Sequence, residues 1–230
     1  MRYKAVVFDL FGTLVDSSSF VEVRDMLVRM ARASGVPEEF FLRAWMGETR
    51  VARSRGQFPD IETCLAHICR LAGVPVEEHR IKEAVSIRLE FTKNALTPRP
   101  DALSTLVGLK ELGLRCGLLS DCSPDVPLLW PQTPFASIID AAVFSCTAGM
   151  TKPDPRIYHL VCDRLRVRPE QCLYVGDGDS QELTGARAVG MDALMIRVPY
   201  DQGHRTREDD WKGPRIDSLS TVLSLISEAG

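Results

Sequence analysis

Residues 6–16 read VVFDLFGTLVD, in which a short apolar run is followed at once by Asp9 and, after two further residues, by Gly12 and Thr13. The run Ala5–Phe8 is apolar at every position, and such runs without alternation are typical of strands buried on both faces of a parallel sheet. Open sheets of this kind bind ligands beyond the carboxyl ends of their strands. Because Asp9 directly follows the run, we expect it to lie in a polar site at that edge of a parallel sheet.

Four further apolar runs predict the rest of the sheet, and they are Cys116–Leu119, Ala141–Phe144, Cys172–Val175 and Ala193–Val198. Apolar residues at helical spacing predict helices around Leu103–Val107, Ile157–Leu165 and Leu219–Ile226. Gly113 is expected to end the first of these helices, and Ser218 to cap the last. Strands that alternate with helices predict an α/β fold, here a Rossmann-like parallel sheet with helices on both faces.

The first predicted strand is separated from the second by roughly a hundred residues, which is too long for a single crossover. This stretch is itself helical in pattern, with apolar residues at helical spacing over Val23–Met30, Ile61–Ile68 and Ile81–Leu89. We therefore predict an inserted α-helical cap domain over residues 17–95 and an α/β core domain over residues 1–16 and 96–230. An insert at this point of the chain stands above the edge where the ligand is expected.

The composition argues against several classes of protein. Of the 230 residues 45% are hydrophobic and 26% are charged, and the formal net charge of -3 argues against nucleic acid or an anionic membrane as the main partner. The seven cysteines include no C-x-x-C pair, so buried free thiols are expected rather than a disulfide framework or a zinc site. No apolar run resembles a signal peptide or reaches transmembrane length, and a cytoplasmic location is expected.

Chemically reactive side chains follow four of the predicted strands. Besides Asp9 they are Ser120 in GLLSDCS (117–123), Lys152 in GMTKPDPRIY (149–158) and Asp177 in CLYVGDGDSQE (172–182). The carboxyl ends of parallel strands meet at one edge of a sheet, so we expect these four side chains to be neighbours. Two carboxylates, a hydroxyl and a cation in one crevice can bind an anion, hold a divalent cation and attack an electrophile.

These four segments resemble, in their order and spacing, the four motifs of the haloacid dehalogenase superfamily of hydrolases. One such motif alone is weakly specific, but four in order are specific. They cover the predicted core, whereas the predicted cap matches only in position and helicity. The resemblance implies that Asp9 is a covalent nucleophile and that Lys152 pairs with Asp9 and with the substrate, a small anionic molecule. It also implies that Thr13 and Ser120 position the transferred group.

The resemblance further implies a Mg²⁺ site formed by Asp9, Asp177 and the backbone carbonyl of Phe11. Phe11 also departs from the pattern D-x-D-G-T of phosphatases in this superfamily, where the second aspartate protonates the leaving alkoxide. A phenyl ring cannot transfer a proton, and such an acid contributes ~10²–10⁴-fold to the rate. We therefore expect metal binding to persist, and hydrolysis of ordinary alkyl phosphate esters to be slow unless another group serves.

Three functions are compatible with these residues. Metal-independent 2-haloacid dehalogenases resemble this chain in having an aromatic residue at the place of Phe11, but they typically show serine and asparagine where this chain has Gly176-Asp177-Gly178-Asp179. Two carboxylates without a cation raise the pKa of one of them, so the retained Asp177 favours a Mg²⁺-dependent phosphatase of a small phosphorylated metabolite. A non-catalytic binding protein is the third alternative, supported by Phe11 and by Asp121-Cys122, where relatives often have Asn-Gly.

Several residues have two interpretations. Glu182 is either a metal ligand, directly or through water, or the partner of Asp179 in a helix capping box. Tyr158 either belongs to the site or packs inside the core. The arginines Arg43, Arg50, Arg53 and Arg55 form either a solvated helix face or a binding site for a substrate carboxylate. Asp201–Pro214, which includes Trp211, is expected to be a surface loop, and the sequence leaves monomer and homodimer open.

Overall fold

The computed structural model describes residues 2–200 and 210–228 of the chain. Within these residues six parallel strands form one sheet in the order β3-β2-β1-β4-β5-β6. The strands are β1 (Ala5–Phe8), β2 (Arg115–Ser120), β3 (Ala141–Phe144), β4 (Cys172–Gly176), β5 (Asp192–Ile196) and β6 (Arg215–Ile216). The predicted α/β class and parallel sheet are confirmed, and the five predicted strands are found within one or two residues of their expected ends.

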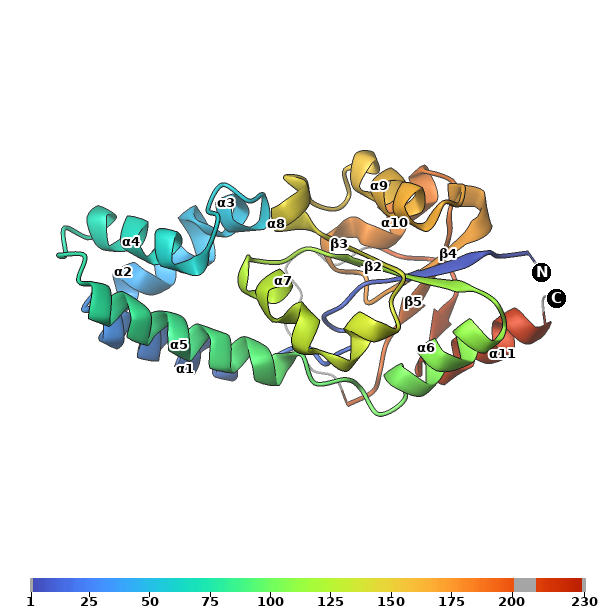
Figure 1. Ribbon diagram of the computed structural model, residues 1–230, viewed down its shortest axis with the longest axis horizontal. Coiled ribbons are helices and arrows are strands. Elements are labelled where there is room, and N and C mark those ends of the chain that lie inside the picture. Colours follow the sequence, from blue (N-terminus) through green and yellow to red (C-terminus); the bar gives the residue numbers. More distant parts are fainter. Residues whose placement is uncertain (1, 201–209, 229–230) are drawn as a thin grey trace.

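The central strand β1 explains why its sequence is apolar throughout. All four of its residues are fully buried: Val6 and Phe8 belong to the hydrophobic core on one face of the sheet, and Ala5 and Val7 to the core on the other face. Helices α6 (Ala102–Glu111) and α11 (Ser220–Glu228) cover the first face, and α9 (Pro155–Leu165) and α10 (Glu182–Ala188) the second (Figure 1). Both faces of β1 are therefore dry, as its composition predicts.

Short helical segments complete the core. They are α7 (Asp125–Leu129), η2 (Trp130–Gln132), η3 (Pro134–Ser137), α8 (Ser145–Ala148), η4 (Pro169–Gln171) and η5 (Asp179–Gln181). Three of these, α7, α8 and η5, lie in the connections that leave the carboxyl ends of β2, β3 and β4. These connections carry most of the predicted site residues.

Helices α1 to α5 form a helical insert between β1 and β2, on the side of the molecule away from the two termini (Figure 1). It comprises α1 (Phe20–Ser34), α2 (Glu38–Arg43), the π-helical turn η1 (Ala44–Glu48), α3 (Arg50–Ser54), α4 (Ile61–Leu71) and α5 (Glu78–Ala95). Its buried apolar side chains, such as Leu27, Phe41 and Ile68, form a third hydrophobic cluster separate from the two around the sheet. Ser19 and Glu22 form a capping box at the start of α1, and Asp60 caps α4.

The insert is joined to the core by buried polar contacts between α5 and α7. The carboxylate of Asp125 is fully buried, and its Oδ2 lies 2.9 Å from a guanidinium nitrogen of Arg88 and 2.5 Å from the Thr92 hydroxyl. Arg53 of α3 donates a hydrogen bond of 3.3 Å to the hydroxyl of Ser123. A buried carboxylate requires such partners, so this contact fixes where the insert stands relative to the loop that follows β2.

The structure corrects two expectations near the carboxyl terminus, one of them only in part. Ser218 does not cap the last helix: α11 begins at Ser220, and the amides of Leu219 and Ser220 donate instead to the carboxylate of Asp101, more than a hundred residues earlier in the sequence. The described part of the predicted surface loop, residues 210–214, is irregular and mostly exposed, but Trp211 within it is buried. Trp211 is 5% exposed, packs in the second core and precedes β6, a two-residue strand too short to leave a pattern in the sequence. Positions 201–209 of this predicted loop lie outside the described residues.

No helix within the described residues is long and apolar enough to span a bilayer.

We expect the substitution Arg88→Met to lower the free energy of unfolding by about 3 kcal/mol, because it leaves the buried carboxylate of Asp125 without its ion-pair partner. Urea denaturation would measure the loss. Arg24→Met, which removes the exposed ion pair with Glu38, is the matched control and should change stability by less than about 1 kcal/mol. Equal effects of the two substitutions would contradict the role given to the Asp125 contact.

Candidate active site

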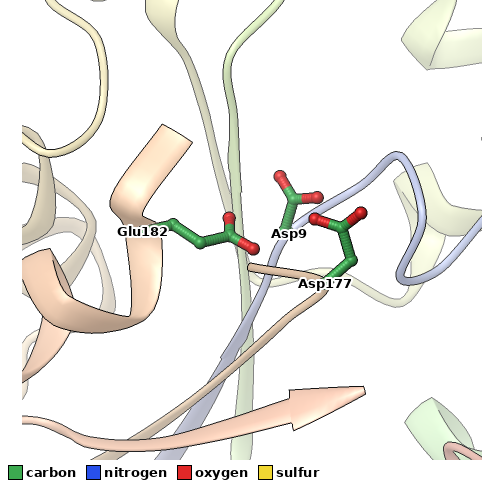
Figure 2. A group of neighbouring side chains, drawn as sticks. All are labelled: Asp9, Asp177 and Glu182. Carbon is green, nitrogen blue, oxygen red and sulfur yellow. The ribbon is translucent and has the colours of Figure 1, made fainter. Parts of the chain in front are cut away.

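The order of the strands brings the predicted site residues together. Strand β1 lies between β2 and β4, so Asp9, Ser120 and Asp177 follow neighbouring strands at one edge of the sheet. Figure 2 shows the carboxylates of Asp9 and Asp177 side by side beyond these strands, with Glu182 approaching them from the start of α10. Lys152 reaches the same place from the segment between α8 and α9.

Lys152 lies at the centre of this arrangement. Its ammonium nitrogen Nζ is 2.6 Å from Oδ1 of Asp9 and 2.5 Å from Oε2 of Glu182, and its side chain is 4% exposed. Burial works against the charged ammonium, but the carboxylates of Asp9 and Glu182 outweigh it and hold the pKa of Lys152 well above its ordinary value. The lysine is therefore a permanent positive charge in contact with the predicted nucleophile.

The surroundings of the two carboxyl groups that contact Lys152 favour their neutral form. Burial, with the charge of Asp177 adding to it and Lys152 opposing it, raises the pKa of Asp9 to about 6. Burial and the charge of Asp9 raise the pKa of Glu182 to about 8. Both raised pKa values indicate that Lys152 alone does not balance the negative charge of Asp9, Asp177 and Glu182 when all three are ionised. The site therefore favours binding of a further cation over full ionisation of its acids.

The residues present fit a divalent metal ion. Asp9, Asp177 and Glu182 each offer a carboxylate oxygen, these oxygens lie within 4.8 Å of one another, and all three residues are buried. Hard divalent cations such as Mg²⁺ prefer oxygen ligands of this kind. Gly12 leaves space for the Asp177 carboxylate. Its φ of 76° is left-handed, and a Cβ atom there would stand 2.5 Å from Oδ2 of Asp177.

Glu182 is not the partner of Asp179 in a capping box, so that interpretation is wrong. Helix α10 begins at Glu182 itself, after Gln181, and has no side-chain cap. The Glu182 carboxylate instead accepts hydrogen bonds from the Gly178 amide (2.9 Å), from the Tyr174 hydroxyl (2.7 Å) and from Lys152. Both of its oxygens thus accept hydrogen bonds from protein donors, so Glu182 binds Lys152 as well as lying beside Asp9 and Asp177.

Two residues that the sequence interpretation missed hold the site in place. Tyr174, fully buried in β4, also has its hydroxyl 3.4 Å from Nζ of Lys152. Arg99 is 2% exposed and donates to the backbone carbonyl of Thr13 and to Asp16, which ties the loop after β1 to the end of the insert. A signal was present for Tyr174, because a tyrosine within a predicted buried strand needs a polar partner for its hydroxyl, whereas the burial of Arg99 is evident only from the structure.

The two predicted substrate-binding hydroxyls share an unusual property. Thr13 and Ser120 are both fully buried, and among the described residues neither hydroxyl oxygen has a hydrogen-bond partner. A buried hydroxyl without a partner costs free energy, and such groups in native proteins call for an explanation. An oxygen-rich substrate group at the carboxyl edge of the sheet would supply the missing partners.

Phe11 and Asp121 flank this edge. Phe11 is partly buried against the first core, and its backbone forms an isolated bridge with Val15, so its side chain has a structural role as well. Asp121 directly follows Ser120, and its Oδ1 accepts the backbone amide of Lys152 at 3.1 Å. Burial raises the pKa of Asp121, opposed mainly by Lys152 and also by Arg50 from the insert.

The remaining candidate site residues, Tyr158 and the four arginines, lie in different surroundings. Tyr158 packs inside the second core, where its hydroxyl donates to the Glu182 carbonyl at 2.9 Å, so it supports the start of α10. Arg43 is exposed, with its guanidinium over the Phe40 ring. The four arginines do not form one helix face, because the run spans α2, η1 and α3. Arg53 is 4% exposed and stacks on Trp45.

Comparison with known proteins places this site in a family. The sequence model of the haloacid dehalogenase-like hydrolases matches residues 3–190. The chain is 30% identical to a glyceraldehyde 3-phosphate phosphatase of Methanopyrus kandleri, over 98% of this chain and 97% of that protein. It is 29% identical to (S)-2-haloacid dehalogenase 4A of Burkholderia cepacia, over 84% of this chain and 82% of that one.

The fold is also similar to the crystal structure of a 2-haloacid dehalogenase from Pseudomonas syringae, with a TM-score of 0.73 and 24% identity over 99% of this chain and 100% of that chain. Phosphatases and dehalogenases both occur among the relatives, so the matches support hydrolysis but do not select the bond that is broken. The family match covers the segments that carry Asp9, Lys152 and Asp177. The chain belongs to the haloacid dehalogenase-like hydrolase family.

Proposed function

We propose that the protein is a Mg²⁺-dependent phosphatase that hydrolyses a small phosphorylated metabolite through a covalent intermediate on Asp9. The observation that carries the proposal is the retention of Asp177 beside Asp9, with Glu182 close by and Lys152 as the cation that contacts two of the three carboxylates. Without a metal ion, the charge of Asp177 would add to burial in opposing ionisation of the Asp9 carboxyl group, and the ionised form is the one that attacks. The ion would be Mg²⁺, held by Asp9, Asp177 and the backbone carbonyl of Phe11.

In this proposal the chain's own residues do four things. Asp9 attacks phosphorus, and Lys152 holds the Asp9 carboxylate in place and neutralises charge on the transferred group. The hydroxyls of Thr13 and Ser120 bind the oxygens of that group, which would satisfy both hydroxyls. Bound Mg²⁺ would supply positive charge to the phosphoryl oxygens.

Asp121 is the residue that we assign to the acid role that Phe11 cannot fill. Its carboxyl group is fixed next to Lys152 by a hydrogen bond to the backbone, and burial keeps its pKa above the ordinary value. The charges of Asp179, in the loop after β4, and of Arg50, in the insert, both affect the pKa of Asp121. The loop that carries Asp121 therefore lies near both of these segments. A protonated carboxyl group there could donate to a departing alkoxide.

The helical insert would act as a cap domain over residues 17–95, with the core over residues 1–16 and 96–230. Contacts of α3 with α8 and of α5 with α7 place the insert against the two loops that follow β2 and β3. Specificity for the small anionic substrate would then arise from residues of the insert such as Arg50, whose positive charge acts on Asp121. A cytoplasmic location is part of this proposal.

The second candidate, a metal-independent 2-haloacid dehalogenase, is favoured by Phe11 alone, because a halide leaves without protonation. The charge of Asp177 beside Asp9 argues against it. A non-catalytic binding protein is less well supported, because the buried contact between Lys152 and Asp9 is the one that a nucleophilic aspartate requires.

We expect an aryl phosphate to be hydrolysed only with Mg²⁺ present, with EDTA abolishing turnover and added Mg²⁺ restoring it. The variant Asp9→Asn should lose more than about 10³-fold in kcat, because it lacks the attacking oxyanion. The assay runs a panel of phosphates and 2-haloacids with and without Mg²⁺. Chloride release from L-2-chloropropionate in metal-free buffer, without phosphate release from any ester, would replace this proposal with the dehalogenase.

The substitution Asp121→Asn tests the acid role, because asparagine keeps the acceptor for the Lys152 amide but has no proton to donate. We expect turnover of an alkyl phosphate to fall by about 10²-fold, and that of an aryl phosphate with a good leaving group to change by less than about 3-fold. A steady-state series of leaving groups measures the difference. A uniform loss across the series would show that Asp121 only supports Lys152.

A further inference from the structure

A pair of cysteines lies at the junction of the loops that carry Ser120 and Lys152. Strands β2 and β3 are paired with Ser120 opposite Phe144, and Cys122 and Cys146 each stand two residues beyond this pair. Their Sγ atoms are 3.9 Å apart. The hydroxyl of Ser145 accepts the Cys122 amide at 2.9 Å and so holds the two loops together.

The spacing is close to that of a disulfide. Cys122 and Cys146 follow neighbouring strands, which lie roughly 4.8 Å apart, and disulfides span Cα–Cα distances of roughly 4.4–6.8 Å. The two sulfur atoms would have to approach by roughly 2 Å to reach the bond length of about 2.05 Å. Rotation of the side chains with a small loop movement can supply that distance.

The two thiols differ in the way that a reactive pair requires. Cys146 is partly exposed, and its hydrogen bond with Cys122 lowers the pKa of the Cys146 thiol. Cys122 is 6% exposed, and burial raises its pKa. The more accessible thiol is therefore also the more readily ionised one, which is the form that attacks an oxidant.

A second pair of neighbouring cysteines serves as a comparison for Cys122 and Cys146. Cys162 of α9 and Cys172 of β4 have Sγ atoms 3.8 Å apart, and hydrogen bonding likewise lowers the pKa of Cys162. Both residues are buried, with exposures of 2% and 0%. Proximity and ionisation are thus similar in the two pairs, and access from solvent is the property that separates them.

We propose that Cys122 and Cys146 form an oxidisable dithiol, which hydrogen peroxide converts to a disulfide that switches off the neighbouring active site. The Cys146 thiolate attacks one peroxide oxygen, the O–O bond breaks, and a sulfenic acid forms as the other oxygen leaves as water after protonation. The Cys122 sulfur then attacks the Cys146 sulfur and displaces a second water. Two thiols are oxidised by two electrons, and one molecule of peroxide is reduced to two of water.

The position of the pair explains the effect on the site. Cys122 is next to Asp121, which binds the Lys152 amide, and Cys146 precedes Lys152 by one short loop. Gly56 of the insert also lies directly on the Cys146 carbonyl, where no side chain would fit. Drawing the two sulfurs together would move the segments that carry Ser120 and Lys152, and a misplacement of about 1 Å can cost about 10²-fold in rate.

To test the proposal, the protein is treated with hydrogen peroxide, and its peptides are then mapped by mass spectrometry without reduction. We expect a Cys122–Cys146 disulfide, no Cys162–Cys172 disulfide, and a loss of kcat of at least about 10-fold that dithiothreitol reverses. Cys146→Ser should keep the basal kcat, form no disulfide and resist inactivation. The matched control Cys162→Ser should behave like the parent protein.

Inactivation of Cys146→Ser at the parent's rate, or a Cys162–Cys172 disulfide in place of the expected one, would overturn the proposal. A disulfide at the expected position with unchanged kcat would overturn the switch. The inactivation readout rests on the proposed phosphatase activity, whereas the peptide map does not. If no phosphate ester is turned over at all, the map still decides whether the dithiol oxidises, so the two proposals fail in different ways.

Discussion

The contact of the Lys152 ammonium with the carboxylates of Asp9 and Glu182 is the constraint on which the site depends. Three acids stand within a few ångströms of each other in a buried place, and such a cluster is unstable without positive charge. Lys152 supplies one charge, while burial and the neighbouring carboxylates raise the pKa of Asp9 and of Glu182. A buried acidic cluster of this kind could hold a metal ion.

The surrounding structure is arranged to keep that contact rigid. Glu182 is fixed by Tyr174 and by the Gly178 amide, and a side chain at Gly176 would collide with its carboxylate. Tyr158 holds the start of α10 from the second core. The loop after β1 is fixed separately by Arg99, which binds the Thr13 carbonyl. These supports come from β4, from the loop after it, from α9 and from the segment that follows the insert, so several parts of the fold hold Glu182 and the loop after β1 in place.

The sequence was sufficient to predict what depends on local pattern. Strand β1, the parallel sheet and the meeting of Asp9, Ser120 and Asp177 follow from apolar runs and from the geometry of strand ends. The role of Glu182 could not be predicted in this way, because its partners Lys152 and Tyr174 come from elsewhere in the chain. The same applies to Asp101, which caps α11 across more than a hundred residues, and to β6, which exists only through its pairing with β5.

The central claim is that Asp9 forms a transient covalent bond to the substrate. Enzyme quenched during turnover of an aryl phosphate and reduced with borohydride would convert an acyl intermediate at Asp9 to homoserine, which peptide mass spectrometry detects. The account predicts homoserine at position 9 alone, only when substrate is present and turning over. An unmodified Asp9 in enzyme quenched at full turnover, with the modification on another residue, would contradict it.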